Sequence, residues 1–85
     1  MDIAATIVDL LRERAPNASI CPSDVARALA SDERAWRALM QPVRDEAVAL
    51  AREGCIVMTQ RSREVGPDEA IHGPIRLRRG PAFPH

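Results

Sequence analysis

Residues 36–61, WRALMQPVRDEAVALAREGCIVMTQR, contain a long helical pattern that changes to a strand-like pattern at Gly54. Before the glycine, apolar side chains recur at steps of three and four residues, which is the spacing of an amphipathic helix. These side chains are Trp36, Met40, Val43, Ala47 and Leu50. After the glycine, residues 55–60 are rich in β-branched and apolar side chains, which favours a strand. The segment therefore predicts a helix that ends at Gly54 and leads directly into a sheet.

Pro42 interrupts the helical pattern. Proline lacks a backbone donor and clashes with the preceding turn, so we expect either a kinked helix or a short helix over 33–40 followed by a separate one over 42–53. Trp36 falls on the apolar seam, and we predict that it anchors the core there. Because Phe83 is the only other aromatic residue, the sequence offers no platform on which bases could stack.

Two shorter helices are predicted ahead of this segment. The first begins after Asp2 as its N-cap, follows an apolar stripe that includes Ile3 and Ile7, and ends before Pro16. Residues 19–21 then leave room for no more than a single-bridge strand. A second helix is predicted to follow this link.

The second helix is predicted to open at Pro22, because proline suits a first helical position. Its neighbour Ser23 has two interpretations, a helix cap or a hydroxyl that binds phosphate, and we favour the cap. Val25 and Leu29 belong to the apolar stripe that faces the core.

The C-terminal part of the chain is predicted to complete a hairpin. Residues 75–78, IRLR, alternate apolar with charged side chains and are expected to pair with residues 55–60. Between the two runs, residues 61–73 form a long polar loop with glycine and proline turn signals. The chain of 85 residues has room for one domain, which we place at residues 1–80, followed by an irregular tail over 81–85.

The elements follow one another in the order helix, short strand, helix, helix and hairpin. This is the order of a winged helix, an α+β fold with three or four helices followed by a two- to three-stranded β-hairpin wing. Three segments also resemble a family of short bacterial proteins classed as a domain of unknown function with a winged-helix-like fold. They are ICPSDVARAL (20–29), the segment 36–61 and GPIRLRR (73–79). The resemblance implies a bacterial, cytoplasmic protein and carries no assigned catalytic or binding residue.

The charges of the chain balance overall but not along its length. Twelve arginines oppose twelve acids, so a strongly basic protein that coats DNA is excluded. Residues 1–54 hold seven arginines and nine acids, whereas residues 55–85 hold five arginines and three acids. The basic side of the molecule is therefore predicted to be the hairpin.

The order of elements and this charge split favour a DNA-binding or transcription-associated module. Arginine and glutamine side chains reach base edges and phosphates, so they are the candidate contacts on the helix and on the wing. The candidates are Arg37, Gln41, Arg44 and Arg52 on the helical segment and Arg61, Arg63, Arg76 and Arg78 on the hairpin. Against this, Asp45 and Glu46 would repel phosphate, and the helical face fits a solvated, charge-laced surface at least as well. The hairpin arginines would equally protect an exposed strand edge from aggregation.

The alternative function is a protein interaction module that docks to another protein or to itself as a homodimer, using the first helix or the tail. The fold alone does not decide between the two classes. Cys21 and Cys55 are expected as buried free thiols, and a disulfide between them is left open.

No enzyme, metal, cofactor, small-molecule substrate or membrane span is expected. The sequence has no glycine-rich phosphate loop and no hydrolase or metalloprotease motif. Its three adjacent acidic pairs, at 32–33, 45–46 and 68–69, form no catalytic dyad, because neighbours on a helix point in different directions. The cysteines and histidines lack zinc-ligand spacing. The charged N-terminus is neither a signal peptide nor a membrane span, so we expect a cytoplasmic protein.

Overall fold

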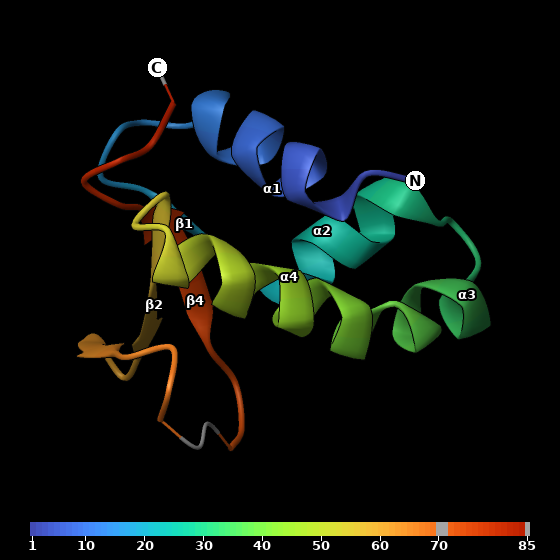
Figure 1. Cartoon of the computed structure of the whole chain (residues 1–85). Helices are drawn as coiled ribbons and strands as arrows, with labels where there is room; N and C mark the ends of the chain where they lie inside the picture. The colour runs from blue at the N-terminus through green and yellow to red at the C-terminus, as the bar shows by residue number, and fades with distance from the viewer. Residues whose placement is uncertain (70–71, 85) are drawn as a thin grey trace.

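The computed structural model describes residues 1–69 and 72–84, and in this part of the chain it has four helices and four strands. The helices are α1 (Ile3–Arg12), α2 (Pro22–Leu29), α3 (Glu33–Ala38) and α4 (Met40–Arg52). The strands are β1 (Ser19–Ile20), β2 (Ile56–Gln60), β3 (Arg63–Val65) and β4 (Arg76–Arg79). Figure 1 shows the longer helices gathered beside the sheet, with α3 at the end of the molecule far from the strands. The predicted α+β class is confirmed.

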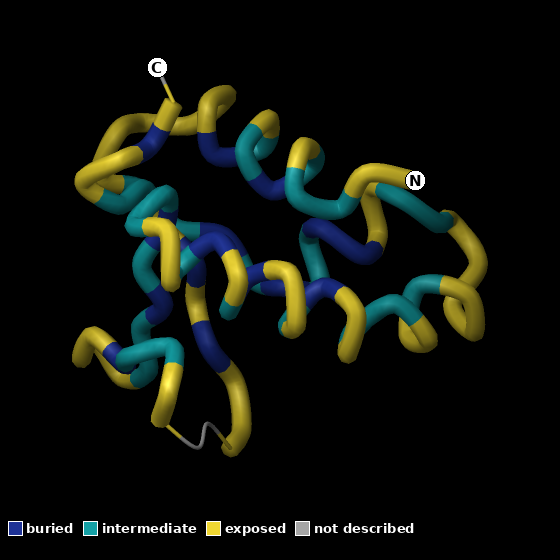
Figure 2. The backbone as a smooth tube through the Cα atoms, viewed as in Figure 1, coloured by how far each residue is buried: buried dark blue, intermediate teal, exposed yellow. Residues whose placement is uncertain are grey.

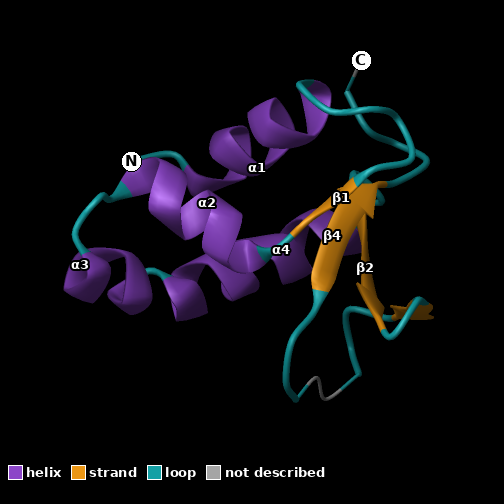
Figure 3. Cartoon of the chain, turned by 180° about the vertical axis from the view of Figure 1, so that it is seen from behind, coloured by secondary structure: helices purple, strands orange, loops and turns teal. Residues whose placement is uncertain are grey.

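The sheet is antiparallel throughout, with the strand order β1-β4-β2-β3. The predicted pairing of the two hairpin runs is confirmed, with Met58 of β2 opposite Leu77 of β4. The short strand predicted near residue 20 is also present, because Ile20 pairs with the same Leu77 from the other side. Strand β4, the last in the chain, therefore lies between the first strand and β2 (Figure 3).

The predicted loop over 61–73 is wrong in its first part. Residues 63–65 form β3, which pairs with the outer edge of β2, so the predicted two- to three-stranded wing is part of a four-stranded sheet. The tight turn between β2 and β3 consists of Arg61 and Ser62, whose φ angles are +54° and +66°. Two-residue hairpin turns of this kind favour asparagine and glycine. Since Arg-Ser lacks that signature, the sequence carried no sign of the turn.

The core lies between the helices and the inner face of the sheet (Figure 2). Its fully buried members come from every layer and include Ile7 and Leu11 of α1, Val25 of α2, Val43 and Ala47 of α4, and Ile56, Met58 and Leu77 of the sheet. The irregular residues 80–84 also pack on the body, because Phe83 is buried and the Ala82 amide donates to the Gly54 carbonyl at 2.9 Å. The tail thus covers the end of the core.

The helical segment divides into two helices, as one of the two alternatives predicted. The division falls at Leu39, and Pro42 lies in the first turn of α4, where its missing N–H costs little. The prediction that Trp36 anchors the core is confirmed only in part, since Trp36 packs against the buried cluster but is itself only partly buried. The break at Leu39 leaves α3 at the margin of the core, where Trp36 and Leu39 pack against the buried cluster without being fully covered.

The helix ends follow local chemistry, with one correction. The Asp2 carboxylate accepts from the Ala5 amide at 3.0 Å, so its predicted role as N-cap is confirmed. The predicted cap Ser23 is wrong, because the N-cap of α2 is Cys21 and the carboxylate of Asp24 accepts from the Cys21 amide at 2.9 Å. A carboxylate at the third helical position accepts a stronger hydrogen bond from the N-cap amide than a hydroxyl would. Its negative charge also interacts favourably with the positive end of the helix dipole.

Candidate nucleic-acid interface

The exposed face of α4 uses its polar side chains for contacts within the molecule. The Gln41 side-chain amide donates to the Asp45 carboxylate at 2.8 Å. The Arg52 guanidinium donates to the carboxylate of Asp68 at 3.1 Å, and Arg44 donates to the carbonyl of Gly73 at 3.0 Å. These three side chains, which were predicted to contact DNA, instead form hydrogen bonds within α4 and between α4 and the loop before β4.

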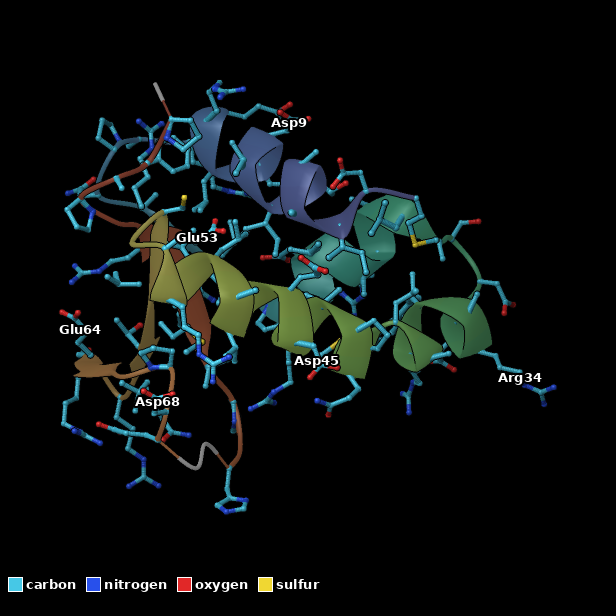
Figure 4. The ribbon with its side chains drawn as sticks, viewed as in Figure 1. Asp9, Arg34, Asp45, Glu53, Glu64 and Asp68 are labelled. Carbon is cyan, nitrogen blue, oxygen red and sulfur yellow. The ribbon has the colours of Figure 1, made fainter. Side chains whose placement is uncertain are left out.

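The exposed surface of α4, together with the loop beside it, carries more acid than base. Asp45, Glu46 and Glu53 are exposed, and Asp68 of the loop lies beside the helix as the partner of Arg52 (Figure 4). Four carboxylates thus face two arginines over this surface, counting Arg44. Because phosphate groups avoid carboxylates, this face is poorly suited to lie along a DNA backbone.

The remaining helical candidate, Arg37, lies apart from the hairpin. It is on α3, where its guanidinium pairs with Glu33 at 3.2 Å and lies 5.4 Å from the centre of the Trp36 ring. Sequence reasoning did not single out Arg34, which is exposed, has no partner among the described residues and points away from the body (Figure 4). No local signal in the sequence marked it, since it is one of twelve similar arginines.

The hairpin candidates lie on different parts of the sheet: Arg76 and Arg78 are on its outer face, whereas Arg61 and Arg63 are at the tip of the β2–β3 hairpin. Leu77 is buried against the helices, and the strand alternation therefore turns Arg76 and Arg78 to the opposite face. The Arg76 guanidinium donates to the Ser19 hydroxyl at 2.9 Å, to the Ser19 carbonyl at 3.0 Å and to the Cys21 sulfur at 2.7 Å. Arg78 is exposed and has no partner in the described part of the chain. One of these two arginines is thus fixed to the sheet, and the other extends from it.

The two arginines of the β2–β3 hairpin lie at the tip of the sheet. Arg61 is exposed, in the left-handed turn, and has no partner within residues 1–69 and 72–84. Arg63 pairs with Glu69 at 3.4 Å, in a contact open to solvent. Both line an open hollow of about 940 Å³ that also includes Arg76. The structure therefore brings three of the four hairpin candidates together, although no sequence pattern placed them in one hollow.

The cysteines lie near opposite ends of β4 and are free. Cys21 follows Ile20, the partner of Leu77, whereas the Cys55 carbonyl accepts from the amide of Gly80 at 3.0 Å. About four strand residues, or roughly 13 Å, separate these two positions, and a disulfide requires Cα atoms within about 7 Å. The disulfide left open by the sequence therefore does not form in this fold. Both thiols are partly exposed rather than buried.

Arg79 has a role that the sequence did not indicate. It follows the exposed Arg78, but its guanidinium turns inward to the last carbonyls of α1, donating to Leu11 at 3.0 Å, Arg12 at 3.3 Å and Arg14 at 3.0 Å. It also lies 4.7 Å from the centre of the Phe83 ring. An arginine at the negative end of a helix is stabilising, so this residue serves the fold.

These features define a small α+β domain with an acidic helical face and an arginine-bearing sheet face. The chain belongs to the family described as protein of unknown function (DUF3253), which matches residues 1–80. No curated protein matches the chain. Among the residues that the structure describes, no group of histidine, cysteine and acidic side chains could hold a metal ion, and no helix is long and apolar enough to cross a membrane.

Proposed function

We propose that this chain is a winged-helix protein that contacts duplex DNA mainly through the outer face of its sheet and the hairpin tip. The element order and the pairing of β1 with the final strand support the fold. Helix α4 directly precedes β2, as a recognition helix precedes a wing. Its acidic surface favours a docking in which the sheet side, rather than the length of α4, approaches the DNA backbone.

The observation that carries the proposal is the charge of the sheet side. Arg76 and Arg78 lie on the outer face, and Arg61 and Arg63 lie at the hairpin tip. Together with Glu64 and Glu69 of the same region they leave a net charge of +2. Glu64 lies at the outer strand, away from β4 (Figure 4). Guanidinium groups arranged in this way form charge-assisted hydrogen bonds with phosphate oxygens.

The strength of this contact follows from the number of arginines. Four phosphate contacts give a slope of log affinity against log salt of about −3.6, so affinity falls roughly a hundredfold between 50 and 200 mM salt. The binding is therefore weak at high salt and depends little on base sequence, because the helix that would read bases has its polar side chains engaged.

The alternative, a protein interaction module, has less support. Among the described residues, Met1 is the only exposed large hydrophobic side chain, at 81% exposure. The proposed docking element at the C-terminus is also occupied, since Phe83 is buried against the body. On the first helix, Ile3, Val8 and Leu10 are each partly covered, so no fully exposed apolar patch marks a docking surface there.

The experiment is fluorescence anisotropy with a mixed-sequence DNA duplex at 50 and 200 mM salt. We expect the salt dependence above, and we expect Arg78→Ala to weaken binding and lower the slope by about one unit. Arg34→Ala is the matched control, because it removes an exposed, unpartnered arginine at the far end of the molecule. Absence of binding at 50 mM salt, or equal losses in the two variants, would overturn the proposal. Solution mass measured alongside would reveal a homodimer.

A further inference from the structure

An open hollow of about 940 Å³ lies at the tip of the sheet. It lies between the β2–β3 turn, the segment that leads into β4, and the start of α2. Its polar lining includes Cys21, Arg61, Arg63, His72 and Arg76. Its volume of about 940 Å³ falls within the range of sites for small molecules, roughly 300 to 1,000 Å³.

The lining of the hollow has a single sign of charge. Three guanidinium groups, those of Arg61, Arg63 and Arg76, contribute to it, and none of its described lining residues is acidic. Arg61 has no partner among the residues that the structure describes, and Glu69, the partner of Arg63, is outside the lining. Three cations in the lining of one hollow, with no carboxylate among its described lining residues, favour a ligand that carries more than one negative charge.

The arginine at the base of the hollow is held in place before any ligand arrives. The contacts of Arg76 with Ser19 and Cys21 use three of its five N–H groups and leave two for a ligand. A fixed guanidinium loses little side-chain entropy on binding, and its planar fork matches two oxygens of a phosphate group.

The side of the hollow is also fixed. The Gln60 side-chain amide donates to the carbonyls of His72 and of Pro74, the latter at 3.2 Å, and so ties the segment before β4 to the end of β2. The pairing of Gln60 with Arg63 sets the hairpin turn that carries Arg61. The three arginines are thus presented by elements that hydrogen bonds hold together.

We propose that this hollow binds a phosphorylated compound of low molecular weight, with its phosphate held by Arg61, Arg63 and Arg76. This site goes beyond the proposed function because it requires no DNA. A backbone phosphate of DNA offers the same chemistry, but the hollow has room for more of a ligand than one phosphate group. Cys21 lies in the lining and reports on occupancy, whereas Cys55 lies outside it.

The experiment measures alkylation of the two cysteines by iodoacetamide, with and without inorganic pyrophosphate at constant ionic strength. A ligand at ten times its Kd slows modification of a covered thiol about tenfold. We therefore expect pyrophosphate to slow alkylation of Cys21 and to leave that of Cys55 unchanged. Arg61→Ala should remove the protection, and Arg78→Ala, which lies outside the hollow, should retain it.

Three outcomes would overturn the site: no protection of Cys21, equal protection of both cysteines, or full protection in Arg61→Ala. A parallel reaction with the mixed-sequence duplex separates the two sources of phosphate. If the duplex protects Cys21 and pyrophosphate does not, the hollow holds DNA backbone, so this proposal fails while the proposed function stands. If pyrophosphate protects Cys21 and the duplex does not bind, the small-molecule site stands and the proposed function fails.

Discussion

Replacement of Arg79 by methionine tests how the last strand holds the first helix. The guanidinium donates from one nitrogen to three carbonyls at the end of α1, and it lies 4.7 Å from the Phe83 ring centre. Methionine has a similar length and keeps most of the apolar contact, but it removes the charge and the donors. The α1 carbonyls and the packed tail would both lose a partner.

The cost follows from these contacts. A hydrogen bond from a charged donor contributes about 1.5 to 3 kcal/mol, and we count the shared nitrogen of Arg79 as one such interaction because its three acceptors compete. The contact with the Phe83 ring adds about 0.5 to 1 kcal/mol. The buried Nε of Arg79 has no partner among the described residues, so its removal stabilises the folded variant by about 1 kcal/mol. The net loss in the free energy of unfolding is therefore about 2 kcal/mol.

The assay is thermal unfolding followed by circular dichroism. In a domain of this size each kcal/mol moves the Tm by about 4 to 8 °C, so we expect Arg79→Met to lower the Tm by roughly 8 to 16 °C. Arg78→Met is the control, because the side chain of Arg78 is exposed on the other face of the strand. This substitution should change the free energy of unfolding by no more than about 0.5 kcal/mol. Equal shifts in the two variants, or an unchanged Tm in Arg79→Met, would refute the reasoning.

Three further predictions concern other positions. In Gly80→Ala the new Cβ would overlap backbone atoms where α4 leads into β2, so urea unfolding should show a loss of about 1 to 3 kcal/mol in the free energy of unfolding. Gly66→Ala is the control, because no atom lies nearer than 3.9 Å to its new Cβ, and it should show no loss from overlap. Ser62→Gly relieves a left-handed φ of +66° and should raise the urea midpoint; a lowered midpoint would contradict the observed turn. Arg27→Ala removes the guanidinium 4.5 Å from the Trp36 ring centre and should change the tryptophan emission spectrum, and an unchanged spectrum would contradict this contact.

The candidate site shows where sequence reasoning reached its limit. Alternation in IRLR predicted correctly that Arg76 and Arg78 share a face, because strand geometry alone determines it. For the helical segment, the sequence predicted that Arg52 could contact phosphate, although in the structure it pairs with Asp68, sixteen residues away in the chain. Whether a charged side chain is free depends on which distant carboxylate the fold brings within reach, and local spacing carries no such information.

The sequence by itself determined the elements whose causes are local. Helical periodicity and the stop at Gly54 placed the main helix, β-branched and apolar composition placed β2, and alternation placed β4. Only the tertiary structure decided that Arg-Ser would form a hairpin turn, that Trp36 would lie at the margin of the core, and that arginines from a turn and from β4 would share one hollow. The physical reason is that periodicity and capping act over one or two turns of chain, whereas pairing and packing join residues far apart in the sequence.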